Sequence, residues 1–198
     1  MKILATSLLP GLLWVSLALG QGTFFYDQQS STDETPWGYG GGGSLPSIAP
    51  CGQSFTPTLS GVNFVRLNLN DGNPNDGLGT TIHLNLRANS FSGTILGTSD
   101  TVAMPNGFTG VENFFFPSII SLTPDTLYFF EVVETPSWVQ WNIAAGSYDY
   151  YRGDAYYLGR AASGSDLWFR EGIYVPEPSA LALAALAAAT LAYTRRKR

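Results

Sequence analysis

Cysteine and histidine are nearly absent from this 198-residue sequence, which contains one of each, Cys51 and His83. A single thiol excludes an internal disulfide, so the fold must depend on a hydrophobic core. Cys51 is expected to be a buried small residue, the alternative being an intermolecular bridge. The sequence shows no Ser-His-Asp or Cys-His arrangement for nucleophilic catalysis and no cluster with zinc-ligand spacing.

Basic residues are also scarce once the two ends are set aside. Of the ten Lys and Arg residues, Lys2 lies in an N-terminal apolar segment and four lie at positions 195–198. The central part therefore contains five basic residues and all fifteen Asp and Glu residues, which gives it a net charge of −10. Nucleic acids are therefore excluded as partners, because their binding requires Lys and Arg to neutralise phosphates. An extracellular location and cation binding are compatible with this charge.

Helical periodicity is missing from the central part, where strand patterns recur instead. Val65, Leu67 and Leu69 alternate with polar residues, as do Ile82, Leu84 and Leu86, and this period of two is typical of half-buried strands. Shorter strand signals follow at residues 93–98, 127–133, 139–143 and 166–173. We therefore predict an all-β fold, an antiparallel jelly-roll-like β-sandwich, over residues 49–174.

Residues 21–48 precede this predicted domain. They include the run Gly-Tyr-Gly-Gly-Gly-Gly-Ser at 38–44, which has few side chains to bury. We predict a flexible Gly-rich lead-in here, with a possible first strand at 23–27.

The N-terminus has the layout of a secretory signal peptide. Lys2 is followed by a nearly uninterrupted apolar run, and Ala18 and Gly20 place small residues before a cut at Gln21. Residues 1–20 are thus predicted to be a signal helix that is removed on export. The alternative is an uncleaved anchor helix.

The C-terminus combines a proline motif, an apolar run and a basic end. The apolar run, 180–194, would be roughly 22 Å long as a helix at 1.5 Å per residue, which is short of the roughly 30 Å hydrocarbon core. We therefore predict a short transmembrane helix that holds the protein transiently, with the basic end cytoplasmic. The residues of this predicted sorting signal are Val175, Pro176, Glu177, Pro178, Ser179, Arg195, Arg196, Lys197 and Arg198.

This order of features resembles the PEP-CTERM sorting signal of Gram-negative bacteria, over residues 175–198. An ordinary tail anchor would not explain the Pro-Glu-Pro motif. The resemblance implies that an exosortase, a membrane-embedded cysteine-type transpeptidase, processes the tail after the secretion machinery has exported the chain. It also implies a cell-surface or extracellular-matrix protein, often associated with extracellular polysaccharide.

A looser resemblance concerns the predicted sandwich. The segments Gln53-Ser54-Phe55, 93–97, 122–128 and 166–170 follow one another as in jelly-roll domains of the carbohydrate-binding-module type. Such a likeness supports the fold more than any ligand.

Two sets of residues are candidates for binding. The polar loop between the first two strand signals offers oxygen ligands for a structural calcium, although Asp, Asn and Gly are also ordinary turn residues; its members are Asp71, Asn73, Asn75 and Asp76. An aromatic-rich stretch suggests sugar stacking, although large aromatics also fill sandwich cores; its members are Trp138, Trp141, Tyr148, Tyr150, Tyr151 and Arg152.

Catalysis has one pair of candidates, Glu131 and Glu134. Glycoside hydrolysis needs two facing carboxyl groups, but residues three apart on a strand point to opposite faces. We therefore predict a non-catalytic protein, with a glycan-active enzyme and a purely structural matrix subunit as alternatives.

Overall fold

A computed structural model of the chain describes residues 22–36 and 43–177. The predicted signal helix at 1–20, residues 37–42 of the Gly-rich run and the predicted tail helix therefore lie outside the described residues. Within these two ranges, no helix is long and apolar enough to cross a bilayer.

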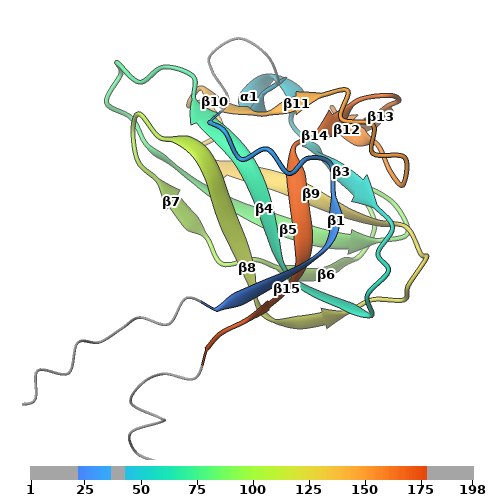
Figure 1. Ribbon diagram of the computed structural model, residues 1–198. Helices are drawn as coiled ribbons and strands as arrows, with labels where there is room; N and C mark the ends of the chain where they lie inside the picture. The colour runs from blue at the N-terminus through green and yellow to red at the C-terminus, as the bar shows by residue number, and fades with distance from the viewer. Residues whose placement is uncertain (1–21, 37–42, 178–198) are drawn as a thin grey trace, which may run out of the picture. The chain divides into compact units, whose positions relative to one another are not determined.

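The described residues form an antiparallel β-sandwich (Figure 1), which confirms the all-β prediction. One sheet has the order β1-β15-β4-β10-β2, with β8 also paired to β4, and the other has the order β13-β12-β3-β9-β5-β6, with β7 also paired to β5. Strands β11 and β14 form a small third sheet. The elements are β1 (Thr23–Gln29), β2 (Gly43–Ser44), α1 (Leu45–Ile48), β3 (Cys51–Phe55), β4 (Gly61–Asp71), β5 (Thr80–Ala88), β6 (Ile95–Thr98), β7 (Val102–Met104), β8 (Thr109–Ser121), β9 (Tyr128–Thr135), β10 (Trp141–Ile143), β11 (Ala145–Gly146), β12 (Ala155–Tyr157), β13 (Arg160–Ala162), β14 (Asp166–Leu167) and β15 (Phe169–Val175).

The alternating residues predicted to face inward do form the core. Their side chains are buried, and β4 contributes one row while β5 contributes the other: Val65, Leu67, Leu69, Ile82, Leu84 and Leu86. Burial of six such side chains, each worth about 1.5–3 kcal/mol, explains why these two strands define the facing layers of the sandwich.

The outer face of β4 is less exposed than a half-buried strand would be. Asn68 is buried, and its Nδ2 donates to the carbonyl of Thr35 (3.0 Å). Glu34 accepts hydrogen bonds from Arg66 (2.5 Å) and Arg170 (2.6 Å) through one carboxylate oxygen. The segment 30–36 therefore crosses this face of the sheet and covers it.

Residues 22–36 and 43–48 of the predicted lead-in are described, and the possible first strand predicted at 23–27 is confirmed as β1. They supply β1 and β2 to the first sheet, and α1 places the buried Leu45 in the core. The residues on either side of the glycine run pair at the edges of the first sheet. Composition alone does not predict such pairing, because the partner strands lie far away in the sequence.

The two ends of the sandwich can be located along β4. Its first residue, Gly61, pairs with Ser121 of β8, and its last, Asp71, pairs with Trp141 of β10. The last residues of β15 lie at the Gly61 end, where the Asn63 side chain bonds the backbone N (2.6 Å) and O (2.9 Å) of Tyr174. Figure 1 shows the start of β1 beside the end of β15.

Candidate functional site

The loop between β11 and β12 forms a shallow hollow of about 240 Å³, lined by Asp149, Tyr150, Tyr151, Gly153, Asp154, Gly164 and Asp166. Asp166 of β14 anchors this loop: its Oδ2 accepts from the backbone N of Tyr150 (3.2 Å), and its Oδ1 accepts from Nε2 of Gln53 (3.0 Å). Burial raises the pKa of Asp166, and these two hydrogen bonds oppose that rise. The anchored loop holds Tyr151 at the rim, 89% exposed.

Four of the six predicted sugar-binding residues are accessible. Trp138 is 66% exposed in the turn before β10, Tyr148 is half-buried, and Arg152 pairs with Asp125 (2.6 Å). The structure brings Tyr151 together with the carboxylates of Asp149 and Asp154, but Trp138 does not line this hollow.

The other two predicted sugar-binding residues belong to the core, which corrects the prediction. Trp141 is fully buried and stacks on Phe108, with ring centroids 6.3 Å apart. Tyr150 packs edge-on against Phe169 (5.1 Å), and its hydroxyl donates to Oε1 of Gln28 (3.2 Å). Neither ring offers a free face to a sugar, because each fills the sandwich interior.

The two acidic members of the predicted calcium set are hydrogen-bonded to the backbone. Both oxygens of the buried Asp71 accept from backbone N–H groups, Oδ1 from Asn73 and Oδ2 from Gly107, each at 2.8 Å. Asp76 accepts from the N–H of Leu78 (2.8 Å), while Asn75 is exposed. These are turn-stabilising bonds, and no group of three or more His, Cys, Asp and Glu side chains suited to a metal occurs in the described part of the chain.

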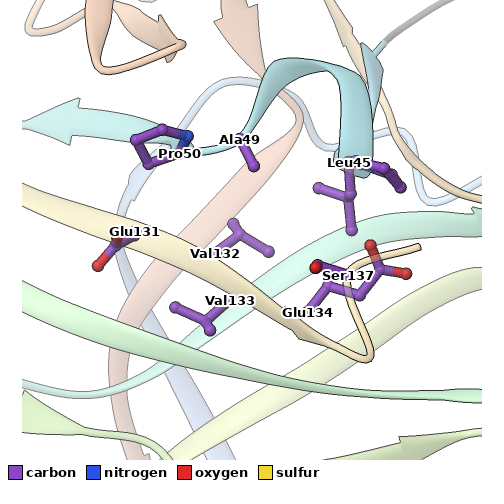
Figure 2. Close-up of a pocket in the computed structure, with 9 residues that line it drawn as sticks. Leu45, Ala49, Pro50, Glu131, Val132, Val133, Glu134 and Ser137 are labelled. Atoms are coloured by element: carbon purple, nitrogen blue, oxygen red, sulfur yellow. The ribbon is translucent and has the colours of Figure 1, made fainter. Parts of the chain in front are cut away.

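A second hollow, of about 280 Å³, lies between α1 and β9, and both candidate catalytic residues, Glu131 and Glu134, are among those that line it (Figure 2). Glu131 accepts hydrogen bonds from Arg87 (2.6 Å) and Asn85 (3.1 Å) of β5. Figure 2 shows Glu134 at the opposite end of the hollow, near Leu45 and Ser137. The two carboxyls have different surroundings and offer no facing pair for glycoside hydrolysis.

Glu134, one of the two candidate catalytic carboxyls, has surroundings that sequence reasoning did not predict. Both of its carboxyl oxygens are buried without a hydrogen-bond partner. Burial raises its pKa to about 7, and the nearby Thr80 hydroxyl, which donates to the carbonyl of Thr135 (3.1 Å), acts in the opposite direction. The signal was present in the sequence, since Tyr128, Phe130, Val132 and Glu134 occupy alternate, inward positions of β9.

Cys51 is fully buried at the start of β3, which confirms the prediction of a buried small residue. Burial in apolar surroundings raises the pKa of its thiol to about 12, and the charges of Glu131 and Glu134 add to the effect. The thiol is therefore unreactive at neutral pH.

The sorting residues are described only as far as Glu177, and Val175, Pro176 and Glu177 are exposed. Pro178, Ser179 and the basic residues 195–198 lie outside the described ranges. Neither the curated proteins nor the solved structures include one that matches this chain. Residues 175–198 match the family model of the PEP-CTERM protein-sorting motif, which supports export of the chain and its processing by an exosortase.

Proposed function

We propose that the chain is a non-catalytic cell-surface or extracellular-matrix protein, delivered by its sorting tail. The observation that carries this proposal is that the matched motif begins at Val175, the last residue of β15. β15 lies between β1 and β4 in the first sheet. The sandwich is thus the cargo that the tail delivers, with the secretion machinery and an exosortase as its processing partners and the membrane as a transient holding site.

Intact mass spectrometry of the protein tests this delivery step. In a host with an active exosortase, we expect the mature protein to lack both the signal peptide and the tail. Replacing Pro176 and Glu177 by alanine is expected to leave the tail attached and the protein in the membrane fraction. A wild-type protein that keeps residues 175–198 in the same host would contradict the proposal.

Polysaccharide contact at the Tyr151 hollow is the finer part of the proposal. The sandwich and its jelly-roll, carbohydrate-binding-module-like sequence order favour it. The exposed Tyr151 ring provides a stacking surface, and Asp149 and Asp154 provide acceptors for hydroxyl groups beside it. The hollow is therefore suited to a neutral sugar unit whose face stacks on Tyr151 and whose hydroxyl groups, at its edge, donate to the two carboxylates.

A glycan array probed with the secreted form tests the sugar contact. Tyr151→Ala is expected to weaken any binding by about 0.5–1.5 kcal/mol, or about two- to tenfold. The matched control is Trp138→Ala, which removes an exposed aromatic outside the hollow. Binding to no glycan, or equal losses in the two variants, would reject the Tyr151 hollow as a sugar site.

A purely structural matrix subunit is the second candidate. It is favoured by the burial of Trp141 and Tyr150, which removes two of the aromatic rings on which sugar binding was predicted. An array that shows no glycan binding, together with correct tail removal, would favour this candidate.

A further inference from the structure

Five apolar side chains gather at the end of the sandwich where β4 begins. Phe25 is 54% exposed, Ile119 is 58% exposed and Val175 is 48% exposed. Leu59 is also exposed, and Ile173 is half-buried. We call this set of five residues the basal patch; its members come from β1, the loop before β4, β8 and β15.

Local geometry shows that the segments that carry these residues are neighbours. A side chain added at Gly61 would meet Ile119 at 2.8 Å and Ile173 at 3.9 Å. On the other side of β15, the carbonyl of Phe25 lies so close to Gly172 that an added Cβ would be 2.0 Å away. β1 and the loop before β4 are also joined, because Asp27 accepts from the N–H of Leu59 (2.9 Å).

Asp27, an acidic residue beside the basal patch, is hydrogen-bonded within the fold. Both Asp27 oxygens are already engaged: one accepts from the N–H groups of Thr58 (2.7 Å) and Leu59, and the other accepts from the Thr58 hydroxyl. Single exposed apolar residues are ordinary on protein surfaces, but a group of them rimmed by satisfied polar groups marks an interaction site.

The position of the chain's exit identifies the partner. Val175 belongs to the basal patch and is also the first residue of the matched sorting motif. The apolar run begins five residues later, at Ala180, and five residues extend at most about 17 Å. When that run enters a bilayer, the patch is therefore held close to the lipid headgroups, a layer of about 5–7 Å on each side of the hydrocarbon core.

We propose that the basal patch rests on the bilayer interface while the sorting tail is inserted, so that the lipid surface orients the sandwich. This inference rests on the membrane-held stage of the proposed function. Phe and aliphatic side chains enter the headgroup boundary favourably. A neutral lipid surface suits this end better than an anionic one, because the body carries a net charge of −10.

The orientation has a consequence for the opposite end. β4 has eleven residues, so its far end lies about 35 Å from the patch at about 3.3 Å per residue. Trp138 precedes β10, which pairs with that far end. The seated sandwich therefore presents the Trp138 turn away from the membrane, toward the surroundings of the cell.

Depth-dependent fluorescence quenching with the full chain tests whether the basal patch rests on the bilayer. Ile119→Cys and, as matched control, Trp138→Cys carry an environment-sensitive nitrobenzoxadiazole label. The buried Cys51 thiol is expected to stay unlabelled, which the wild-type chain checks. Labelled proteins are bound through the tail to phosphatidylcholine vesicles with brominated acyl chains, and binding is measured by flotation. We expect several-fold stronger quenching and a blue-shifted emission at 119 compared with 138.

The possible outcomes distinguish a failure of the contact between the basal patch and the bilayer, called here the lipid seat, from a failure of the proposed function. Flotation with equal quenching at the two positions overturns the seat and leaves tail insertion intact. Failure to float overturns both, because the tail then does not hold the protein. If the label at 119 is shielded without vesicles and the shielding grows with protein concentration, a second copy of the chain covers the patch, and the lipid seat is wrong.

Discussion

At the scale of single residues, the sandwich buries carboxyl groups in places that normally hold apolar side chains. Glu134 has no hydrogen-bond partner for either oxygen, and Glu171 has one bond, from the backbone N of Gln28 (3.1 Å). Burial raises the pKa of both groups, that of Glu134 to about 7. Both carboxyls therefore stay protonated to a higher pH inside the fold than an exposed glutamate does.

We expect the stability of the protein to fall as the pH rises from about 4.5 to about 7. Because the Glu134 pKa is higher in the folded chain than its ordinary 4.5, its proton stabilises the fold fully below pH 4.5, and this contribution is lost as the pH passes through 7. Glu134→Gln should therefore be more stable than wild type at pH 8, by on the order of 1–2 kcal/mol once solvent screening is allowed for. Urea unfolding at pH 5 and pH 8 measures the difference.

Glu131→Gln is the matched control for this prediction. Glu131 is paired with Arg87 at 2.6 Å, so its replacement should lower stability at pH 8, the opposite sign. Equal pH dependence in Glu134→Gln and wild type would show that Glu134 does not titrate between pH 4.5 and 7.

At the scale of secondary-structure elements, the attachment of β1 to β15 depends on a glycine. The Cβ of any other residue at Gly172 would lie 2.0 Å from the carbonyl O of Phe25 and 3.0 Å from the backbone N of Asp27. Its φ of +154° is also one that other residues rarely adopt. Only glycine allows the two strands to approach this closely.

Gly172→Ala is therefore expected to loosen β1 and to destabilise the protein by about 2–3 kcal/mol. Amide hydrogen exchange should accelerate over Thr23–Gln29 while β5 and β9 remain protected, because these two strands lie in the other sheet. Gly146→Ala serves as control, since its added Cβ would meet Tyr148 at an ordinary 3.8 Å. Similar exchange in β1 of both variants would contradict this role for Gly172.

At the scale of the whole molecule, the net charge of −10 between the two ends governs the response to salts. Repulsion among the acidic residues weakens as ions screen it, so added salt should raise the melting temperature modestly. Each carboxylate oxygen of Asp71 already accepts a hydrogen bond from a backbone N–H group, so this carboxylate stabilises the loop without a cation.

Calcium and magnesium chloride at equal concentration are accordingly expected to raise the melting temperature equally. Differential scanning calorimetry measures the two shifts. A larger shift with calcium that disappears in Asp71→Asn would instead establish a calcium site in the loop after β4.

Features of the fold that depend on neighbouring residues could be predicted from the sequence, whereas features that depend on distant strands could not. The buried side chains of β4 and β5 could be predicted, because alternation along one strand determines which side chains share a face. The tail was readable because its proline motif, apolar run and basic end are contiguous. In the candidate site, the sequence could not separate the exposed Tyr151 and Trp138 from the buried Trp141 and Tyr150, because burial depends on distant strands.

The sequence by itself determined the strand pattern, the acidic body and the sorting signal, since each depends on neighbouring residues or on composition. Only the tertiary structure decided which aromatics are buried, that both oxygens of the Glu134 carboxyl are shielded from solvent, and that the segments carrying Phe25, Leu59, Ile119, Ile173 and Val175 lie at one end. Those outcomes depend on strands far apart in the chain pairing in a particular order, and β15 lies between β1 and β4 only in the folded protein.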